Sequence, residues 1–424
     1  MGTPAASHDR VTNIATAISE LIYASQTQGS YPSVLKQPLP ERERAAVLRS
    51  YYQRWVLTEL RRASECVEPL MSANRWTEIK YNRVPSICMQ TKNELFIKHD
   101  PVGFEEYLIA VESKKKTITG ATLFPHELVA KAMELASSAR STDLKGGMSK
   151  LRQLKKEIAL TQLRVVEAQW KSLISNLRKS GSIKRSLAVC DVSGSMGCLG
   201  RRYNKKHNQP IEVSVSLSLV LATLTEPPFS GGFITFSGSP SFQQIDVTKP
   251  LVEQIDHLKN SEWGFTTNLY SVFVDLLLPL AVKNKIKQED MIERLFIFSD
   301  MQFDASKPTE GSNAANWMTN YDAIEKAYTE AGYKVPQIVY WDLAGSEVAK
   351  TVEVESDRKG VAMMNGFSPA MLKVFMGEED IEGWQEVSED GESVNPVEKE
   401  AFDPVTVMKK ALMRPSFDGL VVVD

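Results

Sequence analysis

The stretch Ser186-Leu-Ala-Val-Cys-Asp191-Val-Ser193-Gly-Ser195-Met-Gly197 decides the fold of this chain. An apolar run long enough for one strand is followed at once by a carboxylate and by two hydroxyls at alternate positions. Glycines between and after the serines give the backbone the freedom that a tight turn needs. In open parallel sheets, ligands bind beyond the carboxyl ends of the strands. The stretch therefore predicts a strand that ends in an oxygen-rich binding site.

Short apolar runs recur downstream and predict further strands: Gly231–Phe236, Leu295–Phe298, Gln337–Trp341 and Gly360–Met364. Amphipathic patterns between most of them predict helices: Ile211–Leu224, Leu251–Leu258, Leu269–Val282 and Tyr321–Ala331. This alternation is typical of an α/β fold with a doubly wound, mainly parallel sheet. We expect that domain at residues 183–424, with an acidic exposed loop at 378–403 and a closing strand at Leu420–Val423.

The preceding part of the chain has helical periodicity instead of short apolar runs. The predicted helices are Thr12–Gln28, Glu41–Cys66, Val102–Val111, His126–Ser138 and Leu151–Lys179. We expect a leader and linker at residues 1–40 and a mainly α-helical module at residues 41–182. The 424 residues are enough for two or three such domains.

Two further segments complete the candidate site. Thr267 precedes a predicted helix, and Asp300 follows the predicted strand Leu295–Phe298. With Asp191, Ser193 and Ser195 they form a set of hard oxygen donors that carries only two charges. Such a set suits Mg²⁺ or Mn²⁺, and the ion completes its coordination shell with the carboxylate or phosphate of a ligand. The five histidines are scattered, so we expect no zinc site.

This constellation resembles the metal-ion-dependent adhesion site of von Willebrand factor A-type (vWA) domains. That family's pattern is Asp-x-Ser-x-Ser after the first strand, a distant Thr, and an Asp after the fourth strand. The resemblance implies that Ser193, Ser195 and Thr267 touch the metal, and that Asp191 and Asp300 act directly or through water. Thr267 is preferred to Thr266 because the family commonly has Thr directly before Asn.

Alternatives exist for parts of this site. An isolated Asp-x-Ser-x-Ser is also typical of a turn held by side-chain hydrogen bonds. A cationic insertion follows the motif and contains Arg201, Arg202, Lys205 and Lys206. It is either a flap that recruits phosphate or an acidic peptide, or a solvated loop.

A wider resemblance rests on Arg75–Ser86, Lys114–Glu127, Ala168–Trp170 and Ser299–Asp304. These segments resemble an uncharacterised vWA-bearing family of plants, fungi and giant viruses, for which no activity is established. The architecture is also similar to the TROVE-module proteins of the Ro type, in which helical repeats bind small RNAs and a vWA domain closes the ring. That similarity implies RNA binding.

Charge is distributed unevenly along the chain. Residues 1–185 contain 29 Lys and Arg against 18 Asp and Glu, whereas the remainder contains 21 against 35. A basic half favours an anionic partner such as RNA. Attraction between the two halves, or charge spread over solvated faces, explains the same pattern. The candidate phosphate-binding residues in this half are Lys114, Lys115, Lys116, Arg152, Lys155, Lys156, Arg178, Lys179, Lys184 and Arg185.

Aromatic residues add a second way to bind RNA. Trp76 and Tyr81, with Arg83, could stack on bases, although core packing is the alternative that we favour for the two aromatics. His126 follows a proline at a helix start, where it can cap or pack.

Compartment and function follow from what the sequence contains. Four cysteines form no CxxC pair and indicate free thiols in a reducing compartment, so we expect a cytoplasmic protein. The longest apolar runs are far short of a membrane span. We expect a non-enzymatic scaffold that docks an acidic protein partner at its metal and binds RNA through its basic half. A protein-only adaptor is the alternative, and a metal-dependent phosphoesterase with Asp304 as base is a third reading. Oligomeric state is not indicated.

Overall fold

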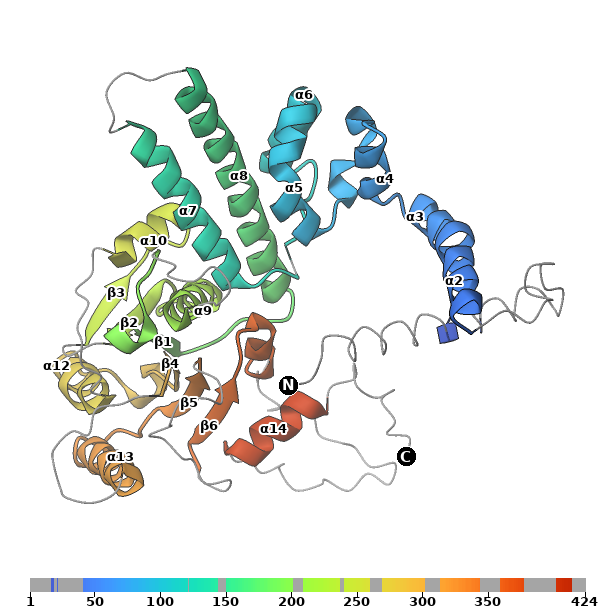
Figure 1. Ribbon diagram of the computed structural model, residues 1–424. Coiled ribbons are helices and arrows are strands. Elements are labelled where there is room, and N and C mark those ends of the chain that lie inside the picture. Colours follow the sequence, from blue (N-terminus) through green and yellow to red (C-terminus); the bar gives the residue numbers. More distant parts are fainter. Residues whose placement is uncertain are drawn as a thin grey trace, which may run out of the picture. The chain divides into compact units, whose positions relative to one another are not determined.

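The computed structural model describes residues 17–18, 21, 41–120, 122–143, 150–200, 209–236, 240–259, 269–301, 313–343, 359–376 and 402–413 (Figure 1). The chain divides into two compact units by its internal contacts. The first contains Met1–Val84 and Lys98–Phe104, and the second contains Pro85–Ile97 and Glu105–Asp424. The predicted domain boundary near residue 183 is a different division, and it stays a prediction.

The first unit is built from short helices. They are α2 (Glu41–Tyr51), the π-helical η2 (Tyr52–Leu57), α3 (Thr58–Ala63), α4 (Val67–Ser72), and the 3₁₀ turns η3 (Trp76–Glu78) and η4 (Tyr81–Arg83). Trp76 stacks on His99 with ring centroids 4.3 Å apart. The Tyr81 hydroxyl donates to Asp100 Oδ2 over 2.8 Å. Both aromatic side chains are buried. Core packing is therefore confirmed for this pair, and the base-stacking alternative is wrong for the fold as it stands.

Four helices open the second unit. The first two are α5 (Ser86–His99) and α6 (Pro101–Glu112). The second unit contains α5 up to Ile97 and α6 from Glu105 onward, because Lys98–Phe104 belongs to the first unit. The other two, α7 (Pro125–Asp143) and α8 (Lys150–Arg178), pack along each other as a hairpin (Figure 1). Arg164 of α8 pairs with both Glu105 and Glu112 of α6, at 2.8 and 2.6 Å. These ion pairs fix α6 against the long helix.

A six-stranded sheet follows in the order β3-β2-β1-β4-β5-β6. The strands are β1 (Ser186–Asp191), β2 (Gly232–Phe236), β3 (Ser241–Gln244), β4 (Arg294–Ser299), β5 (Gln337–Asp342) and β6 (Val361–Asn365). Every neighbouring pair is parallel except β2 and β3. The chain moves outward from β1 to β2 and then returns to the other side of β1 with β4. This reversal is the mark of a doubly wound sheet.

Alternate residues of the strands enter two separate cores. In β1, Leu187 and Val189 belong to one core, whereas Ala188 and Cys190 belong to the other. The first core also contains residues of α11 (Leu269–Ser271), the π-helical η6 (Val272–Leu277), α12 (Leu278–Lys283) and α13 (Asn313–Glu330). The second contains residues of α7, α8, α10 (Leu251–Lys259), η8 (Pro369–Val374) and α14 (Pro404–Leu412). Side chains alternate across a strand, so both faces of this sheet must be covered.

Helix α9 (Pro210–Leu224) lies inside the second core. It packs on β1 and β4 and is in turn covered by α7 and α8. All residues from Ile211 to Leu224 are buried. Ser216 Oγ donates to the carbonyl of Val213 within the helix over 2.9 Å, and Ser214 Oγ donates to the carbonyl of Phe298 in β4 over 2.9 Å. The α7–α8 hairpin is therefore a third layer over the sheet.

The predicted fold class is confirmed as a helical half followed by a doubly wound α/β domain. The edge strand β3 was not expected, because Ser241–Gln244 has a single large apolar residue. Helices α4, α5 and α14 were also not expected. Within the described part of the chain, no helix is long and apolar enough to cross a membrane. The predicted strand Leu420–Val423, residues 378–401 of the acidic loop, and most of the predicted helix Thr12–Gln28 lie outside the described residues.

Candidate metal centre

The carboxyl ends of β1 and β4 meet at the point where the strand order reverses. Cys190 pairs with Phe298 in the parallel register, so Asp191 and Ser299 are the next residues across the two strands. Asp300 directly follows β4, and its side chain is buried. Crevices at such reversal points are where doubly wound sheets bind ligands. The structure thus brings Asp191 and Asp300 to one edge of the sheet.

Asp191 is held by two hydrogen bonds from two different segments. Its Oδ1 accepts from the backbone N–H of Ser193 over 2.9 Å. Its Oδ2 accepts from the hydroxyl of Ser299. Burial raises the pKa of Asp191 to about 6, and the charge of Asp300 adds to this rise, while the bonds from Ser299 and Ser193 oppose it. A buried carboxylate with raised pKa is one that a cation would stabilise.

The two hydroxyls of the motif lie together in the loop after β1. Ser193 Oγ and Ser195 Oγ are 3.1 Å apart. Ser193 is buried, whereas Ser195, in the 3₁₀ turn η5 (Gly194–Met196), is exposed. Gly197 has φ +97°, and a Cβ there would meet Gln209 Oε1 at 2.9 Å. Glycine at this position lets the loop close tightly against the start of α9.

A third buried carboxylate, which was not among the predicted ligands, lies at the same edge. Asp342 ends β5 and pairs in register with Ser299. Its Oδ2 accepts from Asn365 Nδ2 over 3.3 Å. Ser299 itself was also missed as a partner of Asp191. The available signal was that Ser299 and Asp342 each follow directly on an apolar run, as Asp191 does.

The described donors fit a hard divalent ion. They are hydroxyl and carboxylate oxygens, the ligand types that Mg²⁺ and Mn²⁺ take. Among the described residues, no group of three or more His, Cys, Asp and Glu side chains is placed to hold a metal. An ion at this edge would therefore depend on the serine hydroxyls. Thr267 and the cationic insertion with Arg201, Arg202, Lys205 and Lys206 lie outside the described residues, as does Asp304.

The predicted phosphate-binding residues do not form one cluster. Lys114, Lys115 and Lys116 are exposed in the turn after α6. Arg152 and Lys155 are exposed near the start of α8, and Arg178 and Lys179 lie at its other end, roughly 40 Å away along a helix of 29 residues.

Several of these side chains have structural partners. Arg178 donates to the carbonyl of Thr223 over 2.9 Å and so satisfies the end of α9. Lys179 donates to Asn176. Arg185 pairs with Glu293 and donates to the carbonyl of Glu289. The lysines after α6 and the residues at the start of α8 are thus the more available part of the set.

His126 lies in the core of the second unit. It is stacked against Phe124, at 5.4 Å between ring centroids, and meets the edge of Phe367 at 5.6 Å. Its side chain is buried. The packing alternative is therefore the one that the structure favours for this residue.

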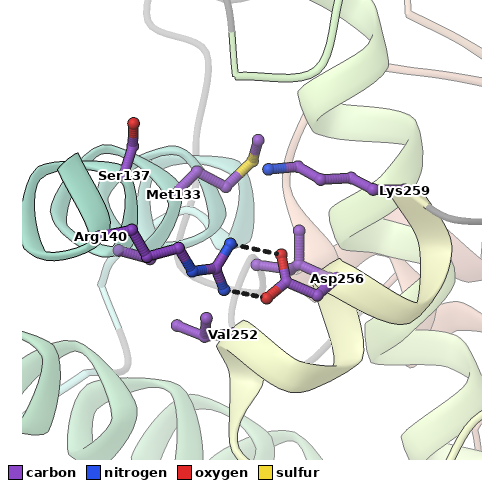
Figure 2. Close-up of a pocket in the computed structure, with 8 residues that line it drawn as sticks. Met133, Ser137, Arg140, Val252, Asp256 and Lys259 are labelled. Atoms are coloured by element: carbon purple, nitrogen blue, oxygen red, sulfur yellow. Dashed lines mark hydrogen bonds and ion pairs between the residues drawn. The ribbon is translucent and has the colours of Figure 1, made fainter. Parts of the chain in front are cut away.

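A cavity of about 240 Å³ lies between α7 and α10 (Figure 2). Arg140 and Asp256 form an ion pair across it, and Lys259 points toward Met133. None of the residues that line it belongs to the predicted ligand set. The ion pair offsets the charge of Arg140, and Lys259 is a further cationic side chain of the lining.

One curated protein that is similar to this chain is itself described as uncharacterised. The uncharacterized protein L728 of Acanthamoeba polyphaga mimivirus is 29% identical over 340 residues, which is 77% of this chain and 52% of the relative. The chain thus spans about half the length of this curated relative. The expectation of a family that extends to giant viruses and has no known function is confirmed.

Two family models cover nearly all of the chain. The model described as Domain of unknown function (DUF2828) matches residues 2–183, which include α7 and α8. The model described as Domain of unknown function (DUF7788) matches residues 185–412, which include all six strands, α9 and the loop after β1. The second match covers more than half of the 424 residues, and the chain belongs to the family described as Domain of unknown function (DUF7788).

Proposed function

We propose that the sheet-bearing half is a vWA-type domain that binds Mg²⁺ or Mn²⁺ and docks an acidic group of a protein partner on the ion. Asp191, Ser193, Ser195, Thr267 and Asp300 would hold the metal. The observation that carries the proposal is the pair of hydroxyls at 3.1 Å beside the buried Asp191, at the point where the strand order reverses.

Docking of an acidic group follows from the open coordination of this site. Two carboxylates balance the charge of a divalent ion, but five protein oxygens leave at least one of its six coordination positions open, and a carboxylate oxygen of a partner can fill it. The exposure of Ser195 leaves that side of the loop open to a partner. A partner's Asp or Glu is the protein group that meets both requirements.

We propose binding without catalysis. The donor set is rich in hydroxyls, in contrast to the carboxylate-rich two-metal centres of phosphoester hydrolases. A metal-dependent phosphoesterase would require a general base, for which Asp304 is the sequence candidate. Turnover of a phosphoester that disappears in Asp300→Ala would establish that reading instead.

The test is direct titration of the full chain with Mn²⁺ by calorimetry, followed by displacement with Mg²⁺. One site is expected, weakened about tenfold or more in Ser195→Ala, because the water that takes the place of the hydroxyl is not held by the protein. Ser113→Ala is the matched control, since Ser113 is an exposed serine after α6 and should leave the affinity unchanged. Absence of binding by the unmodified chain at millimolar Mn²⁺ would refute the metal proposal.

We propose further that the helical half binds RNA through phosphate contacts. Three consecutive exposed lysines, Lys114, Lys115 and Lys116, together with Arg152 and Lys155, support this. Such contacts give affinity that falls steeply with salt and carries little sequence information. The protein-only adaptor remains the alternative, in which the same lysines meet an acidic protein surface.

The RNA proposal is tested on the purified full chain by its nuclease-sensitive nucleic-acid content at low and high salt, and by titration with a structured RNA. Changing Lys114, Lys115 and Lys116 to Ala should weaken binding and flatten the dependence on salt. A triple change of the exposed Lys283, Lys326 and Lys334 removes the same charge elsewhere and should have a smaller effect. If the purified protein carries no RNA and does not bind added RNA, the RNA proposal is refuted and the protein-only adaptor is the function that remains.

A further inference from the structure

We propose that Ser299 is the positioning residue of the metal centre: its hydroxyl fixes the carboxylate of Asp191, and a left-handed turn at Met301 fixes Ser299. The inference rests on the proposed metal site and adds to it a residue outside the five predicted ligands. It is carried by three contacts within the second unit.

The first contact crosses the two central strands. Ser299 is the last residue of β4 and is fully buried. Its Oγ donates to Asp191 Oδ2, at the end of β1. A serine hydroxyl has a single proton, so this proton is committed to the carboxylate. The bond ties together the two strand ends that contribute the charged groups of the site.

The second contact fixes the direction of that proton. The backbone N–H of Met301 donates to Ser299 Oγ over 3.1 Å. The amide occupies an acceptor position of the hydroxyl, so the oxygen is held from one side and its proton is aimed at the other. The order of donation is Met301 N–H to Ser299, then Ser299 O–H to Asp191.

The turn that supplies this amide is unusual. Met301 has φ +61°, in the left-handed region that non-glycine residues rarely adopt. Its side chain is fully buried in the core beside α11 and α13. Burial of the methionine thus holds the backbone in this conformation. This left-handed residue directly follows Asp300, so the same backbone segment carries Ser299, Asp300 and the amide of Met301.

The third contact completes the constraint on Asp191. Its Oδ1 accepts from Ser193 N–H over 2.9 Å, while Oδ2 is held by Ser299. With both oxygens fixed, rotation of the carboxylate would break at least one of these hydrogen bonds in a buried site. Hydrogen bonds to metal-site groups from outside the ligand set commonly change metal affinity by 10- to 100-fold.

The experiment compares Ser299→Ala with Ser186→Ala in the full chain. Ser186 is also a fully buried strand serine with one hydroxyl bond, to the carbonyl of Lys184 at 2.9 Å, but it lies at the opposite end of β1. After thermal unfolding curves establish that both variants are folded, Mn²⁺ is titrated into each. Ser299→Ala should weaken Mn²⁺ binding about 10- to 100-fold, and Ser186→Ala should bind as the unmodified chain does. Ser299→Thr, which keeps the donor, should restore most of the affinity.

The possible outcomes distinguish failure of the Ser299 inference from failure of the proposed metal site. Equal Mn²⁺ affinity of Ser299→Ala and Ser186→Ala, with tight binding by the unmodified chain, would overturn the role of Ser299 and leave the metal site intact. No binding by the unmodified chain would remove the metal site itself. If Ser299→Ala does not fold, Ser299→Cys replaces it, because a thiol is a weaker donor; affinity equal to that of the unmodified chain would then overturn the inference.

Discussion

Two cysteines of the second unit differ in their access to solvent. Cys190 is fully buried, and burial raises its thiol pKa to about 11. The hydroxyl of Ser214 donates to the carbonyl of Phe298, so the thiol of Cys190 is the donor in its 3.3 Å contact with Ser214. Cys198 is exposed in the loop that follows the serine motif.

This contrast predicts selective alkylation. Iodoacetamide at pH 8 should label Cys198 in the native protein and leave Cys190 unmodified, because the reactive thiolate is scarce at a buried thiol with raised pKa. Peptide mass spectrometry over a time course measures both sites. Cys190 should react only when denaturant unfolds the chain. Equal labelling rates in native buffer would contradict the buried environment.

Lys285 occupies a position that favours glycine. It follows α12 with φ +53°, and its N–H donates to the carbonyl of Val282 while Ile286 N–H donates to that of Ala281. These two bonds define a Schellman C-cap, whose left-handed residue is usually glycine.

Replacement of this lysine should therefore stabilise the protein. Lys285→Gly is expected to increase the free energy of unfolding by about 0.5–1 kcal/mol, because the gain from relieved left-handed strain exceeds the added entropy of the unfolded chain. Thermal or urea unfolding checks it. Lys283→Gly, two residues earlier at the end of α12, should act in the opposite direction. A loss of stability in both variants would be evidence against the cap.

At the scale of elements, α9 differs from the other helices in having no solvent-facing side among its residues from Ile211 to Leu224. Leu221→Ala should lower the free energy of unfolding by about 2–5 kcal/mol, the range for a large-to-small change in a packed core. Leu154→Ala, on a 53% exposed side chain of α8, is the matched control and should cost much less. Chemical denaturation of both variants measures the difference. Similar losses would mean that α9 is less tightly packed than the structure has it.

The sequence predicted the elements best where composition and periodicity agreed. β1, β4 and β5 are continuous apolar runs, which is what burial on both faces requires. β3 was not predicted, because Ser241–Gln244 is an edge strand whose side chains are only partly buried, so its sequence has no continuous apolar run. Local sequence carries no record of such long-range pairing.

The candidate site was predictable only where its residues are close together in the sequence. Asp191, Ser193 and Ser195 are close in sequence, and their spacing alone indicates convergent oxygens. The bond from Ser299 to Asp191 joins residues 108 positions apart and depends on the strand register. Arg178 was predicted as a phosphate-binding residue, yet it donates to the end of α9, a contact that exists only once α8 and α9 have packed.

At the scale of the whole molecule, the division by contacts and the division by family models differ. The two models meet between residues 183 and 185, whereas α7, α8 and the sheet belong to one compact unit. A fragment of residues 185–424 would therefore lack the helices that cover α9. It should aggregate or expose apolar surface to a hydrophobic dye, and residues 85–424 should remain soluble. Size-exclusion chromatography of both fragments tests this. A monomeric, cooperatively folding 185–424 would contradict the covering role of the hairpin.

The burial of α9 beneath α7 and α8 also has an evolutionary consequence. One family model contains the covering hairpin and the other contains the covered helix. A gene that lost the first segment would encode a sheet with a bare apolar helix, and selection would act against it unless another segment supplied the cover. We therefore expect the two segments to be inherited together, and we expect lineages that carry the second alone to show polar substitutions along the outer side of α9.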